Sequence, residues 1–221
     1  ILTFAIFDLS VFFYISCMKT TLLFLSVFLS VSLFGQNVYI PDANFKAYLV
    51  GNPEINTNGD TEIQVSEASA YTGIIDCSGQ SIYDLTGIEV FTALTELYCH
   101  NNQLTSLDLS SNSALETLHC ASNQLTYVDV ASNTALTNLN CQGNQLSSLN
   151  ISNNIYLESI YCGLNQLTSL DLSSNTALTF LDCQGNQIGS LDVSSNTSLG
   201  LMGCGSNQLA SLDVSNNTVL T

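Results

Sequence analysis

LETLHCASNQL, residues 115–125, is the stretch that decides the fold, because it recurs in register along most of the chain. The recurrences are marked by cysteines spaced 21 residues apart: Cys99, Cys120, Cys141, Cys162, Cys183 and Cys204. Cys77 lies 22 residues before the first of them. The aligned blocks read L-x-x-L-x-C-x-x-N-Q-L-x-S-L-D-L-S-x-N-x-A, and a fixed period of this kind indicates coils that stack on their neighbours.

The alternation L-x-C predicts a short strand in each coil. Because strand side chains alternate between faces, Leu118 and Cys120 point inward while His119 points outward. Stacking the coils joins these strands into a parallel sheet with a dry inner face. The alternating S-L-D-L stretches at 106–109 and 169–172 predict a second short strand on the opposite wall. A 21-residue coil leaves little room for a convex helix, so we expect a flattened, strand-rich solenoid.

An asparagine follows each predicted strand where the chain turns. Its amide can satisfy backbone groups that the turn leaves unpaired, which predicts a structural ladder. The members are Asn102, Asn123, Asn144, Asn165, Asn186 and Asn207.

Residues 72–221 resemble the leucine-rich-repeat pattern L-x-x-L-x-L-x-x-N-x-L, with cysteine in place of the third leucine. The resemblance implies a mainly β leucine-rich-repeat solenoid with few or no convex helices and a small helical N-terminal cap. The whole arrangement is similar to internalin-like proteins and to the secreted leucine-rich-repeat proteins of the Bacteroidetes. The sequence stops at Thr221, two residues into a new coil, so we expect a repeat region truncated at its C-terminus.

The cysteine column favours buried free thiols that act as small hydrophobes. Neighbouring coils lie about 4.8 Å apart with parallel side chains. A disulfide needs the two Cβ atoms closer and facing each other. A thiolate metal site needs four converging ligands, which a linear column does not supply.

A second column of carboxylates points outward: Asp108, Asp129, Asp171, Asp192 and Asp213, interrupted by Asn150. Stacked like charges repel. Either nearby serines and turn amides hold each carboxylate, or cations bridge the column. The interruption at Asn150 favours the first alternative.

The first 35 residues are largely apolar and are expected to be separate from the fold. Met18-Lys19 and the apolar run after it read as a signal peptide over residues 18–35, with Gly35 near the cleavage point. Residues 1–17 read as upstream sequence translated from too early a start. The alternatives are a membrane-spanning helix and a lipoprotein anchored through Cys17.

Residues 36–71 do not follow the repeat and are expected to cap the first coil. The stretch 43–50 predicts a short amphipathic helix with Phe45, Leu49 and Val50 on its apolar side. Residues 56–67 resemble an EF-hand or dockerin-type loop and imply a weak Ca²⁺ site through Asn56, Asn58, Asp60 and Glu67. Asn at the first position and Thr61 at the sixth depart from that pattern, and a calcium-free polar turn is the alternative.

The resemblance implies that partners bind the concave sheet, whose exposed columns contain polar and aromatic side chains and no basic residue. The candidate ligand-binding residues are Glu96, Tyr98, His100, His119, Asn140, Tyr161, Phe180 and Asp182. Both histidines of the chain lie on adjacent coils, so a shared cation or ligand is one alternative and ordinary exposed side chains the other.

With 18 acidic residues against Lys19 and Lys46 and no arginine, the chain is a poor partner for nucleic acid or anionic membranes. No pattern of a catalytic site is present. These features predict a non-enzymatic, secreted or surface-exposed adhesion module for a protein or carbohydrate partner, with no membrane contact after signal removal. The alternatives are the repeat region of a larger secreted enzyme and a structural surface spacer.

Overall fold

The structure is a computed structural model that describes residues 35–221. The predictions made for residues 1–17 and for the signal peptide at 18–35 lie outside the described residues, apart from Gly35. Among residues 35–221, no helix has both the length and the apolar character needed to cross a membrane.

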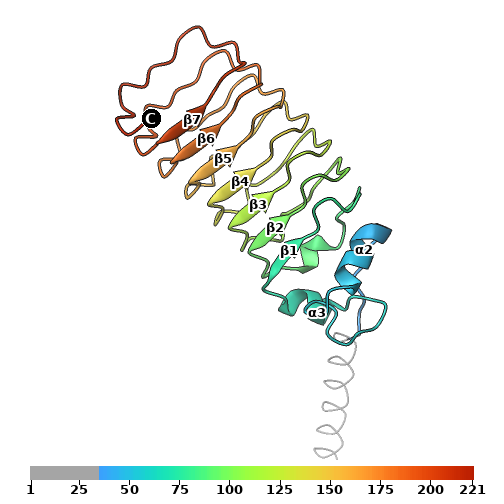
Figure 1. Ribbon diagram of the computed structural model, residues 1–221. Coiled ribbons are helices and arrows are strands. Elements are labelled where there is room, and N and C mark those ends of the chain that lie inside the picture. Colours follow the sequence, from blue (N-terminus) through green and yellow to red (C-terminus); the bar gives the residue numbers. More distant parts are fainter. Residues whose placement is uncertain (1–34) are drawn as a thin grey trace, which may run out of the picture.

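One parallel sheet of seven short strands runs the length of the coils, in sequence order (Figure 1). The strands are β1 (Ile74–Asp76), β2 (Glu96–Tyr98), β3 (Thr117–His119), β4 (Asn138–Asn140), β5 (Ser159–Tyr161), β6 (Phe180–Asp182) and β7 (Leu201–Gly203). Each strand pairs in register with the next, so Tyr98 lies beside His119 and Tyr161 beside Asp182. The predicted leucine-rich-repeat solenoid is thereby confirmed.

The register turns equivalent positions into continuous columns inside the solenoid. The middle residue of strands β1 to β6 is fully buried, as Leu118 and Leu139 illustrate, and the cysteine that follows it is buried too. No coil can cover these side chains by itself, so the apolar core exists only where coils stack on each other.

The predicted asparagine ladder has its expected structural role. Asn144 donates through Nδ2 to the carbonyl oxygens of Cys120 and Cys141, both at 3.0 Å. Its Oδ1 accepts the backbone N–H of Leu125 at 3.0 Å. The same three bonds recur at Asn123 and Asn165, so each amide ties its own coil to the one before.

A second buried asparagine ladder, which was not predicted, lies at the turn that leads into each strand. Its members are Asn112, Asn133, Asn154, Asn175, Asn196 and Asn217. Asn154 donates through Nδ2 to the carbonyls of Val130 and Asn133. Within the described chain the Oδ1 atoms of this ladder are buried and accept no hydrogen bond. The 21-residue recurrence of these asparagines was the sequence signal for this ladder.

The prediction of a second strand at 106–109 and 169–172 is wrong, because neither segment is a strand. The alternation itself is present, since Leu109 and Leu172 are buried while Asp108 and Asp171 are exposed. Each aspartate accepts the backbone N–H two residues further on, as from Ser110 to Asp108 at 2.9 Å. These N–H groups close turns within their own coil and do not pair with the next coil.

The outward aspartates are held by turn amides, as the first of the two alternatives proposed. Asp129, Asp192 and Asp213 accept in the same way as Asp108. Hydrogen bonds from Ser110 and Ser215 lower the pKa values of Asp108 and Asp213. Asn150 makes the same turn without a charge, accepting from Ser152.

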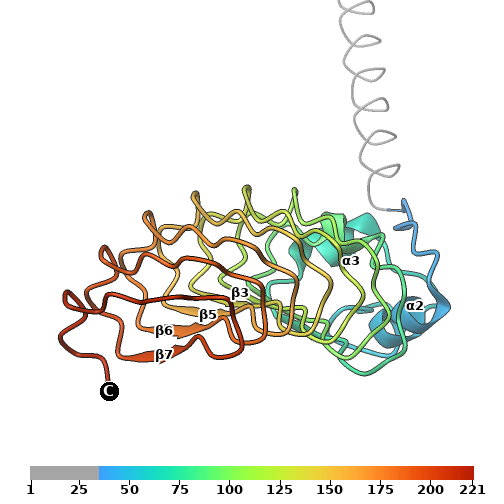
Figure 2. The same ribbon diagram turned by 90° about the horizontal axis from the view of Figure 1, so that it is seen from above.

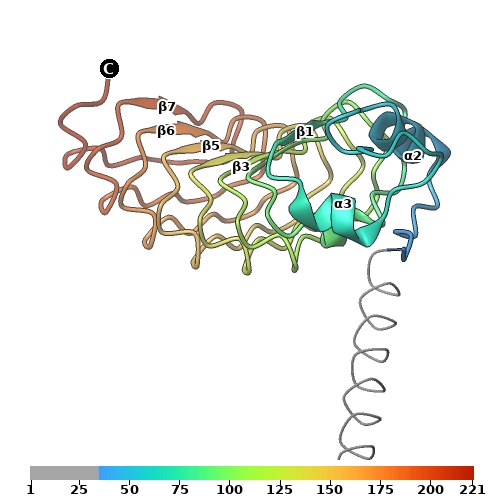
Figure 3. The same cartoon turned by 90° about the horizontal axis from the view of Figure 1, so that it is seen from below.

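A small helical cap covers the first coil, and Figures 2 and 3 show both of its helices at the N-terminal end of the solenoid. Helix α2 (Ala43–Val50) coincides with the predicted segment and buries Phe45 and Leu49, whereas Val50 is only partly buried. Helix α3 (Val65–Ala70) was not predicted. A short 3-10 helix, η1 (Ile88–Val90), follows in the first coil.

Asp42 joins the cap to the solenoid. Its buried carboxylate caps α2 through the N–H groups of Asn44 and Phe45, both at 2.9 Å. The other oxygen accepts the N–H groups of Tyr83 and Asp84 in the first coil. A carboxylate that accepts four N–H groups is well satisfied despite its burial.

The seven cysteines of the described chain are free thiols, and six of them are fully buried. Burial raises the pKa of Cys77, Cys141 and Cys183 to about 12. A buried, protonated thiol is a poor nucleophile. Cys204, in the last described coil, is partly exposed.

We expect the six buried thiols to react with a thiol reagent only in denaturant, while Cys204 reacts in the native protein. Peptide mass spectrometry after labelling, with and without urea, assigns the label to each position. Native labelling of Cys141 at the rate of Cys204 would contradict the buried column.

Candidate ligand-binding face

The outward side of the sheet, here called the sheet face, carries every residue predicted to bind a ligand. Its central column follows the strand register: Asp76, Tyr98, His119, Asn140, Tyr161, Asp182 and Gly203. Glu96 and Phe180 begin their strands, and His100 lies two residues beyond β2. Within the central column, Tyr98, His119, Asn140, Tyr161 and Asp182 are all partly exposed.

Four candidate residues gather near the first coils. The Tyr98 hydroxyl donates to Glu96 Oε2 at 2.7 Å, and this bond raises the pKa of Tyr98. The Tyr98 and His119 rings meet edge to face with centroids 4.8 Å apart. Burial lowers the pKa of His119, and the neighbouring His100 lowers it further. His119 is therefore neutral at neutral pH, and its ring packs as an aromatic group.

The two histidines do lie near one another, as the sequence predicted. Among residues 35–221, however, no group of three or more His, Cys, Asp or Glu side chains is arranged to hold a metal ion. The hydrogen bond from Tyr98 to Glu96 and the edge-to-face contact of the Tyr98 and His119 rings account for the positions of these three side chains.

A second cluster lies on β5 and β6. The rings of Tyr161 and Phe180 stack with centroids 4.5 Å apart and an interplanar angle of 30°. Asp182 lies beside Tyr161 in the register, and its carboxylate accepts the N–H of Gln184 at 3.1 Å. Asn140, on β4, lies between the two clusters and accepts the N–H of Gln142. The candidate residues thus form one surface with two centres.

The predicted calcium loop is a hydrogen-bonded turn in the cap. Glu67 Oε1 accepts the N–H groups of Thr57 and Asn58 at 2.8 and 3.1 Å, and Oε2 accepts the N–H of Gln64. The Asp60 carboxylate accepts from the Glu62 N–H and from the Asn58 side chain. The Asn56 side chain donates to the carbonyls of Val50, at the end of α2, and Asp60, and it accepts the N–H of Gly59.

These bonds account for the loop's polar side chains, with Glu67 also forming the capping box of α3 with Gln64. The weak calcium site therefore stays a prediction. Calorimetry of the full chain with millimolar Ca²⁺ tests it, and the absence of both binding heat and a change in melting temperature would contradict it.

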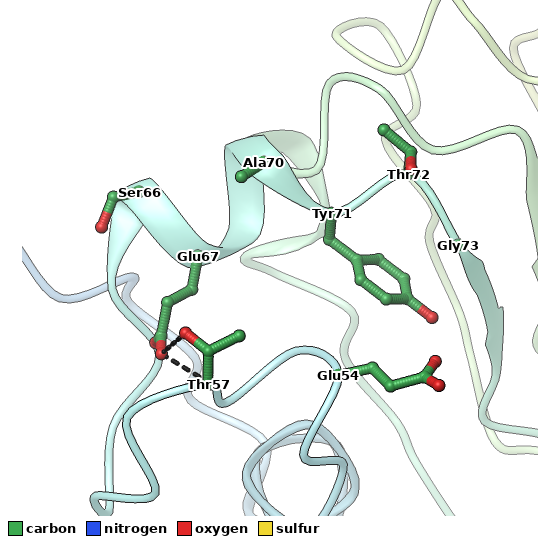
Figure 4. A pocket seen from close by; sticks show the side chains of 8 residues that line it. All are labelled: Glu54, Thr57, Ser66, Glu67, Ala70, Tyr71, Thr72 and Gly73. Atoms are coloured by element: carbon green, nitrogen blue, oxygen red, sulfur yellow. Dashed lines mark hydrogen bonds between the residues drawn. The ribbon is translucent and has the colours of Figure 1, made fainter.

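A hollow of about 550 Å³ lies in the cap beside α3, away from the predicted face. Figure 4 shows Glu67 bonded to Thr57 at one side, and Tyr71 and Glu54 at the other. The Tyr71 hydroxyl donates to the Ile74 carbonyl, so this ring braces the entry into β1. Of the predicted calcium ligands, only Glu67 lines this hollow.

One in-register parallel strand per coil, an apolar inner column and an asparagine ladder at each strand exit define a leucine-rich-repeat protein. Residues 60–175 match the family described as the endo-beta-N-acetylglucosaminidase EndoS LRR domain. The match covers more than half of the chain, and the chain belongs to this leucine-rich-repeat family.

The chain is also similar to internalins of Listeria monocytogenes. It is 42% identical over 77 residues to internalin J of strain F2365, which is 35% of this chain and 8% of internalin J. The solved functional domain of InlJ, described as including a cysteine ladder, is 31% identical, with 85% of this chain and 56% of that chain covered and a TM-score of 0.50.

Internalin C2 of the same strain has a TM-score of 0.76 at 19% identity, with 84% of this chain and 86% of that chain covered. At this identity the likeness shows the fold. The internalin-like resemblance is thereby confirmed, and the fold supports a protein-interaction repeat module.

Proposed function

We propose that the protein is an extracellular adhesion module that binds a macromolecular partner on its sheet face. The observation that carries this proposal is the in-register column of partly exposed aromatic and polar side chains on β2 to β6. Aromatic side chains are enriched at protein interfaces because they bury much apolar area for little loss of conformational entropy.

The chemistry of the face favours a protein partner, with a carbohydrate as the second possibility. Lys46 is the only Lys or Arg among the described residues, and it lies in the cap, bound to Glu62 at 2.6 Å. The face therefore offers no cation to an anionic partner. The apolar segment after Met18-Lys19 supports secretion, and the likeness to internalin J supports a place at the cell surface.

The proposal is tested with the full chain immobilised on beads and offered to a panel of extracellular proteins and an array of neutral glycans. A variant with Tyr98→Ala, His119→Ala and Tyr161→Ala is expected to lose binding at least about tenfold, a loss of about 1.4 kcal/mol or more. The control carries Tyr127→Ser and Asp192→Asn on the opposite wall, where other coils already have Ser106 and Asn150 at the equivalent positions. If the sheet-face variant bound as tightly as the opposite-wall control, recognition on the sheet face would be contradicted and a structural spacer would be favoured.

The repeat region of a larger secreted enzyme is a second candidate, because the matched family is named after the repeat domain of an endo-beta-N-acetylglucosaminidase. In this case the repeats position a substrate for a separate catalytic domain. A catalytic domain in the reading frame beyond Thr221 would favour this candidate.

A further inference from the structure

Two partly exposed aromatic side chains lie next to each other on the sheet face at β5 and β6. Tyr161 and Phe180 form the stacked pair described above. Leu164, at the turn that follows β5, is 57% exposed. With Asp182 beside Tyr161, these four residues are here called the β5–β6 patch.

Leu164 has a backbone conformation that its side chain disfavours. Its φ is 54°, at the turn position where other coils place Asn101, Ser122, Gly143, Gly185 and Ser206, all with positive φ. Glycine and asparagine adopt this left-handed conformation at little cost, whereas a leucine there is strained. Because the Leu164 side chain is exposed, it gains little burial to offset the backbone strain. Backbone strain that does not stabilise the fold points to a binding role.

Two glycines leave room around the Asp182 carboxylate. A methyl group at Gly203 would lie 3.1 Å from Asp182 Oδ1, and one at Gly163 would lie 3.3 Å from the same atom. Gly203 is the direct neighbour of Asp182 on β7. Asp182 thus has Tyr161 on one side and the bare Gly203 on the other, with Gly163 two residues beyond β5, and a ligand can approach its carboxylate alongside the stacked rings.

The negative charge of Asp182 favours a positively charged ligand at the β5–β6 patch. Asp182 has no Lys or Arg to pair with on the described sheet face, and the whole chain has a net charge of −16. Arginine combines a flat guanidinium that stacks on aromatic rings with donors that match a carboxylate in a bidentate geometry. A neutral sugar would use the rings and leave the carboxylate unpaired with any charge.

We propose that the β5–β6 patch binds an arginine-bearing, otherwise apolar segment of a protein partner. This inference rests on the proposed function of the sheet face. The arginine stem and the adjoining apolar residues cover Phe180, Tyr161 and Leu164, while the guanidinium pairs with Asp182.

The test uses fluorescence anisotropy of the full chain at low salt with three labelled peptides of equal length and identical leucines. They carry arginine, glutamine or glutamate at the remaining positions. The arginine peptide is expected to bind at least about tenfold more tightly than the glutamine peptide, and the glutamate peptide to show no binding. Binding of the arginine and glutamine peptides with equal affinity would overturn the proposal.

Variants then locate the site. Asp182→Asn and Phe180→Ala are each expected to weaken the arginine peptide by about three- to tenfold. Asp192→Asn and Tyr127→Ser, which remove a charge and an aromatic ring from the opposite wall, are expected to leave its affinity within about twofold. An equal effect of Asp192→Asn would indicate attraction by net charge alone and would overturn the assignment to this patch.

The Leu164→Gly variant distinguishes a role of Leu164 in binding from a role in stability. Because it relieves the strain at a positive φ, it is expected to raise the melting temperature while it weakens the arginine peptide. A rise in melting temperature with unchanged peptide affinity would remove Leu164 from the site.

The failure of this inference is distinct from a failure of the proposed function. The arginine peptide could fail to bind while a glycan binds and loses its binding in Phe180→Ala. The ligand of the patch would then be a carbohydrate and not a basic segment, and recognition on the sheet face would still hold. Unchanged binding by the Tyr98, His119 and Tyr161 variant would instead remove the proposed function itself.

Discussion

Raising the pH from about 8 to about 10.5 is expected to unfold the protein, because folding requires six buried thiols to stay protonated. Burial raises the pKa of Cys77, Cys141 and Cys183 from an ordinary value of 9.0 to about 12. It holds the pKa values of Cys99, Cys120 and Cys162 well above that ordinary value.

The direction of the effect follows from proton linkage. In the unfolded chain these thiols lose their protons near pH 9, while in the folded chain they keep them, so the folded state binds more protons above pH 9. Stability is complete below the unfolded pKa and is lost as the pH rises toward the folded pKa. At about pH 10 the loss is about 1.4 kcal/mol for each of Cys77, Cys141 and Cys183, or roughly 4 kcal/mol for these three together. Cys99, Cys120 and Cys162 add to the loss in the same direction. A loss of this size is comparable to the total stability of a typical domain, about 5–15 kcal/mol.

Urea unfolding followed by circular dichroism between pH 8 and about 10.5 measures this effect. Cys141→Ala is the control, because it removes one titrating group and should make the pH dependence shallower by about 1.4 kcal/mol per pH unit. A urea midpoint that stays constant over this range would contradict the linkage.

Asn144→Ala is expected to destabilise the fold by about 2–4 kcal/mol. The buried N–H of Leu125 loses its acceptor, the Asn144 Oδ1. The carbonyls of Cys120 and Cys141 each lose one of two donors, since Asn123 and Asn165 still donate to them. A buried donor without a partner costs about 1–3 kcal/mol, and the lost bonds between coils add to this.

Two matched variants serve as controls for the Asn144→Ala measurement. Asn140→Ala, on the partly exposed sheet face only four residues away, is expected to cost under about 0.5 kcal/mol. Asn144→Asp keeps the acceptor for Leu125 but turns a carboxylate oxygen toward two carbonyls, so it should cost at least as much as alanine. Urea denaturation gives the three free energies, and equal values for Asn140→Ala and Asn144→Ala would show that the ladder is not a major source of stability.

The sheet face illustrates how far a periodic sequence predicts a site. The 21-residue period places His119, Tyr161 and Asp182 on one outward column, because the strand alternation repeats identically in every coil. The period does not specify the rotamers on that face. The Tyr161–Phe180 stack and the bond from Tyr98 to Glu96 therefore emerged only from the three-dimensional packing.

The cap illustrates the opposite case. Helix α2 was visible from its apolar spacing, whereas α3 depends on the capping box between Gln64 and Glu67 inside a polar segment that resembled a metal loop. The role of Asp42 was also hidden, since it bonds residues 41 and 42 positions further along the chain.

By itself, the sequence determined the coil length, the strand, the inward cysteines and the first asparagine ladder, since each follows from local periodicity repeated in register. Tertiary structure alone decided that the opposite wall is turns and not strand, that a second asparagine ladder is buried, and that Leu164 has a positive φ at the turn that follows β5. These features depend on which backbone groups and side chains meet between coils, and a one-dimensional period does not specify such contacts.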